Sequence, residues 1–253
     1  MTRVSVIVIT RNEERNIRDC LSSARWADEI IVVDSGSSDG TVAAAREFSE
    51  KVFERPWEGF GASKNFALSK ARNDWVFWLD ADERITPELA EEIELSISKR
   101  TDKAGFSVPR KAFFLGKWIK HCGWYPGRVV RLFRRDKGTF SNDRVHETLI
   151  VDGPVAELKA DLLHYTDPSL EHYFTKFNRY TSLAADDLAG KGRRSGVGRL
   201  LLNPMWTFVR MYFLRLGFLD GMPGLILCML SAGYVFTKYA KLWERTRTME
   251  TIE

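Results

Sequence analysis

The sequence has few cysteines, and their arrangement does not suit a disulfide framework. Its 253 residues contain three, Cys20, Cys122 and Cys228, which are scattered along the chain. Such a set argues against a disulfide-stapled scaffold and for a reducing compartment. No secretory signal is expected either, because the apolar run near the start is short and soon interrupted by charge. We expect that run to form the first strand of the fold.

A dense basic run, of the kind that binds nucleic acid, is also missing. Residues 191–253 carry ten Lys/Arg against four Asp/Glu, while residues 1–190 carry 28 against 30. The basic excess therefore belongs to the C-terminal quarter, where the charges flank apolar stretches. This pattern predicts contact with an anionic membrane surface and no binding of nucleic acid.

Apolar runs alternate with amphipathic segments over the first hundred residues. The pattern predicts strands at 4–10, 29–34, 51–57 and 74–80, and helices at 13–24, 41–48, 61–71 and 86–99. Thr86 is expected to cap the last of these helices. Strands that alternate with helices imply an α/β fold with a mainly parallel, doubly wound sheet. Beyond Gly105, β-like segments follow one another without clear helices between them, which predicts a mixed or antiparallel extension of this sheet.

Clustered carboxylates follow one of these strands directly. In "WVFWLDADE", Asp80, Asp82 and Glu83 come after an almost entirely apolar run. Like charges so close together repel and destabilise the fold unless something positive lies between them. A metal ion or the hydroxyl groups of a ligand would resolve this conflict.

Other polar residues stand at the ends of the neighbouring strands. They are Asp34 and the stretch from Thr10 to Glu13. Ligands of open α/β sheets bind outside the carboxyl ends of the strands, so we expect these residues to converge with Asp80 and Asp82 on one crevice. Taken alone, Asp34 is better explained by an Asx turn, and a short "DAD" motif recurs by chance. Their joint placement favours a binding site.

The chemistry of such a site points to a nucleoside diphosphate. The carboxylate after the second strand can accept hydrogen bonds from a nucleobase or a ribose. In the "DAD" motif, one carboxylate can hold the ribose while the other holds a hard divalent cation, Mg²⁺ or Mn²⁺. The cation would bridge to the diphosphate and neutralise its charge as it leaves.

Four motifs together resemble family 2 glycosyltransferases with the GT-A fold. They are "VSVIVITRNEERNI", "IIVVDSGSSDGT", "GFGASKNFAL" and "WVFWLDADERIT". Two later stretches, "GWYPGRVVRLFRR…FSNDRVHETL" and "GFLDGMPGLILCMLSAGYVFTKYAKLWE", are similar to the WaaE/KdtX-type lipopolysaccharide core glucosyltransferases. The resemblance covers nearly the whole chain. It implies a GT-A domain, Rossmann-like, followed by a C-terminal helical region.

The resemblance also implies roles for individual residues. Asp34 would contact the uracil of a UDP-sugar, with Thr10, Arg11 and Glu13 around the base. Asp80 would bind the ribose, Asp82 the metal, and Lys64 would lie near the nucleotide. For Lys64 a solvated position on a helix is an equally good explanation.

The resemblance also implies roles for residues later in the sequence. Glu147 would be the general base that takes the proton of the acceptor hydroxyl in an inverting transfer, with Asp143 as the second candidate. His146 would bind the diphosphate or the metal, although an ordinary polar loop residue explains it as well. Arg131, with Arg134, would stabilise charge on the leaving UDP, or both would lie on a solvated face. Gly127 stands where relatives often have an acidic residue.

The apolar run of the C-terminal region is at the lower edge of the length that crosses a bilayer. Only 17 uncharged residues separate Asp220 from Lys238, and a membrane-spanning helix needs about 20. We expect helices that lie in the membrane interface, with core helices or a dimer interface as alternatives. The expected division is a GT-A catalytic domain over 1–165, a helical segment over 166–190 and a membrane-associating region over 191–253.

These interpretations predict a peripheral enzyme on the cytoplasmic face of the inner membrane. It would transfer a hexose, glucose, from a UDP-sugar to a lipid-linked saccharide, which the resemblance identifies with the inner-core heptose of lipopolysaccharide. A polyprenyl-phosphate or another glycolipid is an alternative acceptor. A haloacid-dehalogenase-type phosphohydrolase also uses a "DxD" motif, but on its first strand, and a silent membrane-binding module would leave the acidic residues unexplained. The sequence leaves the oligomeric state open.

Overall fold

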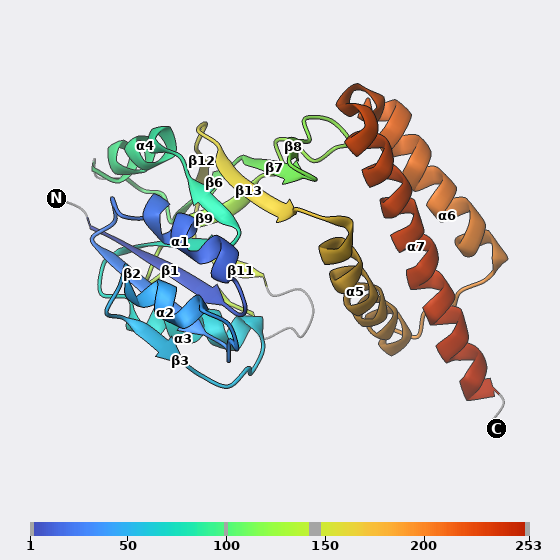
Figure 1. The fold of residues 1–253 in the computed structure, drawn as a ribbon, viewed down its shortest axis with the longest axis horizontal. Helices are drawn as coiled ribbons and strands as arrows, with labels where there is room; N and C mark the ends of the chain where they lie inside the picture. Colours follow the sequence, from blue (N-terminus) through green and yellow to red (C-terminus); the bar gives the residue numbers. More distant parts are fainter. Residues whose placement is uncertain (1–2, 99–100, 142–147, 251–253) are drawn as a thin grey trace. The chain divides into compact units, whose positions relative to one another are not determined.

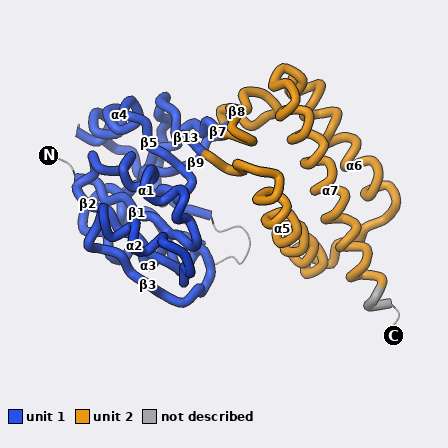
Figure 2. The backbone as a smooth tube through the Cα atoms, viewed as in Figure 1, with its two compact units in different colours: residues 1–111, 127–164 blue, residues 112–126, 165–253 orange. Residues whose placement is uncertain are grey.

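The chain folds into two compact units. The structure, a computed structural model, describes residues 3–98, 101–141 and 148–250. Unit 1 consists of residues 1–111 and 127–164, and unit 2 of residues 112–126 and 165–253 (Figure 2). The division differs from the expected one in two ways. The segment 112–126 belongs to the C-terminal unit, and residues 166–190 lie in the same unit as 191–253.

Within the described residues, unit 1 is built on a seven-stranded sheet with the order β12-β6-β9-β4-β1-β2-β3 (Figure 1). Four strands run parallel: β1 (Val4–Thr10), β2 (Glu29–Asp34), β3 (Val52–Glu54) and β4 (Trp75–Asp80). Strand β9 (Val129–Arg134) is antiparallel to β4 and to β6 (Gly105–Val108), and β6 is parallel to β12 (Val155–Glu157). The predicted parallel sheet with an antiparallel extension is thereby confirmed.

Helices cover both faces of this sheet. On one face α1 (Glu14–Ser23), α2 (Thr41–Arg46) and α4 (Pro87–Ser98) pack against Val4, Val6 and Val8 of β1. On the other face α3 (Phe60–Lys70) packs against Ile7 of β1, because successive side chains of a strand point to opposite faces. Thr86 caps α4 as predicted: its Oγ1 accepts a hydrogen bond from the N–H of Leu89 at 3.1 Å.

Two short ladders complete unit 1. Strand β10 (Gly138–Phe140) pairs antiparallel with β11 (Leu149–Val151). Strand β5 (Glu83–Ile85), which follows β4 almost at once, pairs antiparallel with β13 (Leu162–Asp167). In this ladder His164 stands opposite Glu83. A residue from late in the sequence is thereby brought beside the acidic cluster after β4.

Unit 2 is mainly helical (Figure 1). It contains the end of β7 (Arg110–Phe114), β8 (Lys117–Trp118), α5 (Leu170–Gly190), α6 (Val197–Val209), the π-helical turn η1 (Arg210–Leu214), the 3₁₀ turn η2 (Gly217–Asp220) and α7 (Gly221–Glu250). Its core joins both parts of the unit, since Phe114, Ile119 and Cys122 pack against Met211, Leu227 and Cys228.

A buried carboxylate ties the segment 112–126 to the C-terminal helices. Asp220 is 2% exposed and accepts hydrogen bonds from the backbone N–H groups of Lys120, at 3.3 Å, and His121, at 2.8 Å. The Nδ1 atom of His121 lies 3.0 Å from the same carboxylate. A buried charge is tolerated when it is hydrogen-bonded in this way. Asp220 therefore explains why segments a hundred residues apart fold together.

Candidate functional site

The polar residues at the strand ends lie side by side, as predicted. In the parallel register Thr10 of β1 is paired with Asp34 of β2, and Ile9, one residue earlier, is paired with Asp80 of β4. The carboxyl ends of three adjacent strands therefore present Thr10, Asp34 and Asp80 at one edge of the sheet. This is the edge at which open α/β sheets bind their ligands.

Asp34 is buried in its own loop. Its Oδ1 accepts hydrogen bonds from the N–H groups of Gly36, at 2.9 Å, and Ser37, at 2.8 Å, and its Oδ2 accepts one from the hydroxyl of Ser37. The Asx-turn geometry named above as the simpler explanation is thus present. Carboxylate oxygens have further lone pairs, so this geometry leaves acceptor capacity for a ligand. The contact with a nucleobase stays a prediction.

The stretch after β1 combines buried and exposed groups. Thr10 is 5% exposed, and among the described residues its Oγ1 has no hydrogen-bond partner. Arg11 is exposed. Glu13 is half-buried, with its backbone N–H donating to Thr41 Oγ1 at 2.8 Å and its Oε2 accepting from Asn16 at 2.8 Å. Buried hydroxyls are normally hydrogen-bonded, so the Thr10 side chain is the group in this stretch best placed to meet a ligand.

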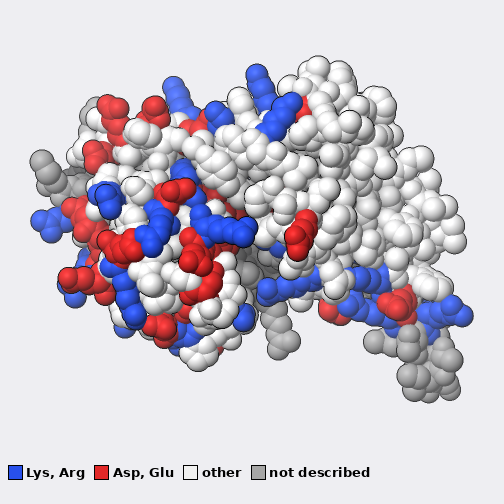
Figure 3. Space-filling model, viewed as in Figure 1, with Lys and Arg blue, Asp and Glu red and all other residues white. Residues whose placement is uncertain are grey.

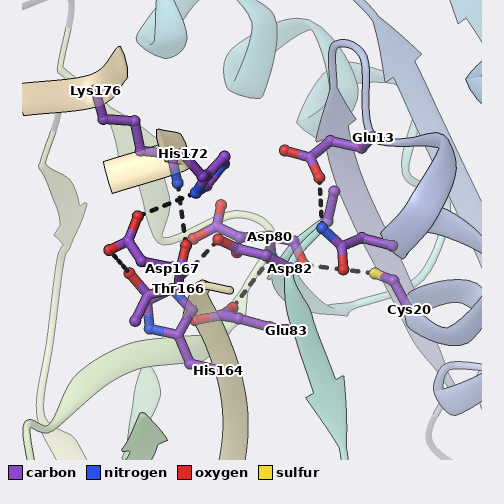
Figure 4. A network of polar contacts seen from close by, with 12 residues as sticks. Glu13, Cys20, Asp80, Asp82, Glu83, His164, Thr166, Asp167, His172 and Lys176 are labelled. Atoms are coloured by element: carbon purple, nitrogen blue, oxygen red, sulfur yellow. Dashed lines mark hydrogen bonds and ion pairs between the residues drawn. The ribbon is translucent and has the colours of Figure 1, made fainter. Parts of the chain in front are cut away.

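Arg131 supplies the positive charge that the acidic cluster requires. Its Nη2 donates to Asp80 Oδ2 and to Glu83 Oε1, both at 2.6 Å, and the guanidinium lies 3.9 Å from the ring centre of Trp78. Trp78 in turn donates from Nε1 to Asp80 Oδ1 at 3.1 Å. Figure 4 shows Asp80 and Glu83 next to each other, and Glu83 Oε2 accepts a hydrogen bond from the backbone N–H of Asp80 at 3.1 Å. The repulsion expected from the sequence is thus resolved by an arginine of β9.

The charges around Asp80 keep it ionised. Burial by itself would raise the pKa of Asp80, but the cations of Arg131 and Lys64 outweigh this effect and lower it to about 2. Burial raises the pKa of Glu83, and Arg131 opposes that rise. Asp80 is therefore the carboxylate that the arginine holds in its charged form.

Two of the alternative explanations are wrong. Lys64 is 2% exposed and lies 3.6 Å from the ring centre of Trp78, so it is not a solvated helix lysine. Arg131 is 1% exposed, so it does not lie on a solvated face. Arg134 does lie on such a face and pairs with Asp136 at 3.0 Å. The ion pairs of Arg131 make it a positioning residue for Asp80, and its contact with a diphosphate stays a prediction.

Asp82 lies beside a histidine that the sequence analysis missed. His164 Nε2 is 3.5 Å from Asp82 Oδ2, and both side chains are about one-fifth exposed (Figure 4). No local motif marks His164, because it reaches Asp82 only through the pairing of β5 with β13. In the part of the chain that the structure describes, no group of three or more His, Cys, Asp or Glu side chains could hold a metal ion. The described side chains therefore offer two ligands here, and a bound ion would need others in addition.

The predicted base and its neighbour lie outside the described residues. Glu147, His146 and the second candidate base, Asp143, belong to the segment 142–147. The segment is flanked by Phe140 of β10 and Leu149 of β11, which pair with each other. The roles of these three residues stay predictions.

The fold and the strand-end site define an enzyme of the GT-A class, a mixed α/β fold with a mostly parallel sheet. The family model described as "Glycosyl transferase family 2" matches residues 5–149. The chain therefore belongs to glycosyl transferase family 2. It is similar to the lipopolysaccharide core biosynthesis glycosyltransferase LpsC of Rhizobium meliloti, with 31% identity over 249 residues, which are 96% of this chain and 92% of that protein. An uncharacterized glycosyltransferase of Rickettsia felis is also 31% identical, over 96% of this chain and 90% of its own length.

Solved structures show the same fold at low sequence identity. The mannosyltransferase PcManGT from Pyrobaculum calidifontis, in complex with GDP-Man and Mn²⁺, matches with a TM-score of 0.55 and 18% identity over 95% of this chain and 86% of its own. Glucosyl-3-phosphoglycerate synthase from Mycobacterium tuberculosis, in complex with Mn²⁺, UDP and glucosyl-3-phosphoglycerate, matches with a TM-score of 0.50 and 17% identity over 77% of this chain and 82% of its own. These likenesses establish the architecture.

The ion pairs of Arg131 predict a large effect of its loss on stability. The substitution Arg131→Met leaves two carboxylates without their partner, and breaking a buried pair in this way should lower the free energy of unfolding by about 3–5 kcal/mol. Arg134→Met, which breaks an exposed pair on the same strand, should cost less than about 1 kcal/mol. Urea unfolding of both variants measures the difference. Equal, small losses would contradict the role given to Arg131.

The pKa of Asp80 predicts how stability depends on pH. This pKa is lower in the folded protein, at about 2, than the ordinary value of 3.8, so the ionised form stabilises the fold. The contribution is fully present above about pH 4 and is lost as the pH falls toward 2. The stability difference between wild type and Asp80→Asn should therefore shrink between about pH 4 and pH 2.5 in urea titrations. The exposed Asp152→Asn is the control, and a constant difference for Asp80→Asn would refute the prediction.

Proposed function

We propose that the chain is an inverting glycosyltransferase that moves a hexose, glucose, from a UDP-sugar to a lipid-linked saccharide. The observation that carries this proposal is the convergence of Thr10, Asp34 and Asp80 at the ends of three adjacent parallel strands, with Asp82 and His164 beside them. The similarity to LpsC of Rhizobium meliloti supports the inner-core heptose of lipopolysaccharide as the acceptor. A polyprenyl-phosphate or other glycolipid remains the alternative acceptor.

The residues present fit a divalent cation shared between protein and ligand. Asp82, in the turn between β4 and β5, and His164, on β13, lie 3.5 Å apart and are partly open to solvent. Mg²⁺ and Mn²⁺ take oxygen ligands, and Mg²⁺ is usually held by one or two carboxylates together with substrate phosphates. Asp82, assisted by His164, would hold the ion, which when bound would offset the charge of the departing diphosphate. Asp80 already forms an ion pair with Arg131, so it suits the hydroxyl groups of the ribose better than the cation.

The remaining steps belong to side chains of this chain. Asp34 and Thr10 would orient the base, and Asp80, kept ionised by Arg131, would accept hydrogen bonds from the ribose hydroxyls. Lys64 would add positive charge near the nucleotide. Glu147 would remove the proton of the acceptor hydroxyl as that oxygen attacks the anomeric carbon from the face opposite UDP. An attack from that face inverts the configuration of the sugar.

Unit 2 suits a peripheral place on an anionic membrane surface, on the cytoplasmic face of the inner membrane. Met222, Met229, Phe236 and Trp243 repeat every seven residues along α7 and are between 43% and 66% exposed. On α6, Leu201, Leu202, Met205 and Trp206 are exposed as well. Figure 3 shows the uncharged surface over these helices and the basic residues along one border of it. Exposed apolar area of this extent marks an interaction surface.

The low burial of α7 argues against its being a core helix. Among the described residues, one helical stretch, Gly217–Arg247, is long and apolar enough to cross a membrane by length and composition. Its most apolar window has a mean hydropathy of 1.5, and only 22% of that window is buried. A core helix would be mostly buried. Lys238 and Arg247, near the end of α7, favour anionic lipid, whereas Lys241 is hydrogen-bonded to Asn178 and Arg245 pairs with Asp186 of α5.

The metal assignment predicts that nucleotide binding depends on Asp82 and His164. Asp82→Ala should abolish the Mn²⁺-dependent part of UDP binding, and His164→Ala should weaken it by about 10- to 100-fold. Isothermal titration of UDP and GDP, with and without Mn²⁺, measures both effects and the choice of nucleotide. Asp39→Ala, which removes a surface carboxylate of the loop before α2, is the control. Unchanged UDP affinity of Asp82→Ala in the presence of Mn²⁺ would overturn the assignment.

If Glu147 is the base, its loss should slow sugar transfer without weakening the binding of the UDP-sugar. Glu147→Gln should leave the affinity for the UDP-sugar almost unchanged while kcat falls by about 10²- to 10⁴-fold, because a base acts on the acceptor and not on the donor. Asp34→Asn should do the reverse and weaken donor binding first. Sugar transfer and donor affinity are measured for both variants. A normal transfer rate for Glu147→Gln would move the assignment to Asp143.

A further inference from the structure

A small pocket in unit 2 contains chemistry that sugar transfer does not use. It has a volume of about 240 Å³ and is lined by Cys122, Gly123, Trp124, Arg210, Met211, Arg215 and Ser231. Cys122 and Met211 are buried, whereas the two arginines are exposed. Pockets for drug-sized ligands measure about 300–1,000 Å³, so this one suits a single small polar group. All of its lining residues belong to unit 2.

A π-helical turn brings both arginines to this pocket. In the turn η1 the backbone N–H of Arg215 donates to the carbonyl of Arg210 at 2.8 Å, a spacing of five residues. In a regular α-helix, side chains five residues apart point about 140° away from each other. The wider π-helical turn reduces that angle, so Arg210 and Arg215 line one pocket. Single π-helical turns of this kind are frequent at functional sites.

The surrounding backbone holds Arg215 in place. The carbonyl of Arg215 accepts a hydrogen bond from the N–H of Cys122 at 3.0 Å, which fixes the turn against the segment 112–126. A Cβ atom on Gly123 would lie only 3.6 Å from Cγ of Arg215, so the arginine stem packs on the glycine backbone. The next residue, Leu216, has a φ of 53°, a left-handed conformation that is uncommon for leucine. Such strained residues cluster at binding sites.

No described residue supplies a counter-charge to the two guanidinium groups. Among the described residues, neither Arg210 nor Arg215 makes an ion pair or a side-chain hydrogen bond. Their neighbours on the surface are apolar, since Phe213, Leu214 and Leu216 are between 44% and 61% exposed. Arginines set in an exposed apolar surface suit the level of lipid headgroups, where the side chains beside them enter the acyl region. Guanidinium groups bind phosphate through paired, charge-assisted hydrogen bonds.

We propose that this pocket binds the phosphate group of a membrane lipid, between Arg210 and Arg215, when unit 2 docks on an anionic bilayer. The inference rests on the membrane association proposed above and adds a specific site to it. Ser231 supplies a hydroxyl donor from α7, and Trp124 is of a type enriched at the depth of the headgroups. The site holds unit 2 at a defined depth and orientation, which bulk attraction between charges alone does not do.

The test compares two pairs of arginines in the full-length protein. Arg210→Gln/Arg215→Gln removes the pocket charges, and Arg193→Gln/Arg194→Gln removes the same charge from exposed residues of unit 2 outside the pocket. Co-sedimentation with phosphatidylcholine vesicles that contain phosphatidylglycerol measures the affinity of each. The pocket variant should lose affinity by about tenfold more than the control variant, because it loses specific phosphate contacts in addition to bulk attraction. Equal losses, or wild-type protein that does not sediment with these vesicles, would overturn the proposal.

Two further measurements identify the source of the phosphate and separate this inference from the proposed function. Titration with inorganic phosphate and with glycerol 3-phosphate should show only weak binding to the wild type. Tight binding of either one, abolished in the pocket variant without any change in vesicle affinity, would assign the pocket to a free phosphate and overturn the lipid site. Mn²⁺-dependent UDP binding should be equal in all three proteins. If wild-type protein binds vesicles through the pocket but transfers no sugar, the proposed function fails and the pocket assignment stands.

Discussion

The ion pairs between Arg131 and the carboxylates of Asp80 and Glu83 are the interaction on which the candidate site depends. Two acidic side chains approach the same buried point at the end of β4, and one guanidinium group bonds to both at 2.6 Å. Without that cation the cluster would favour protonated carboxylates or an opened loop. With it, Asp80 stays ionised at the edge of the sheet. Asp82 is then free to face His164.

This arrangement suits Asp80 and Asp82 to two different roles. Asp80 is tied to β9 through Arg131 and to Trp78 of its own strand, so its orientation is set before any ligand binds. Asp82 is one-fifth exposed and stands next to an imidazole. A preorganised carboxylate suits a hydroxyl group that must be held in one place. A carboxylate that stands beside an imidazole suits a cation that arrives with its diphosphate.

Unit 2 combines a small core with a large exposed apolar surface. The segment 112–126 interrupts unit 1 in the sequence and packs with the C-terminal helices around the buried carboxylate of Asp220. This core leaves the seven-residue repeat of α7 and one side of α6 exposed. The π-helical turn between the helices places Arg210 and Arg215 within that surface. Apolar area and positive charge are thus combined as a bilayer surface would require.

The sequence by itself determined the elements and their ends. The strands 4–10 and 29–34 and the cap at Thr86 were predicted where the structure has them, because apolar periodicity and capping are local properties. The convergence of Thr10, Asp34 and Asp80 followed as well, since parallel strands bring their carboxyl ends to one edge. These features can be predicted from neighbouring residues in the sequence or from a general rule of topology.

Only the tertiary structure decided which charges meet. Arg131 lies 51 residues from Asp80, and its alternating strand is equally consistent with a solvated face until β9 is placed beside β4. Lys64 lies under Trp78 for the same reason, and His164 reaches Asp82 through the ladder of β5 and β13. The joining of 112–126 to the C-terminal helices and the pocket of Arg210 and Arg215 depend on long-range packing too. The pattern of a sequence specifies which side chains can be buried, whereas the partner of a buried charge is chosen by contacts between segments far apart in the chain.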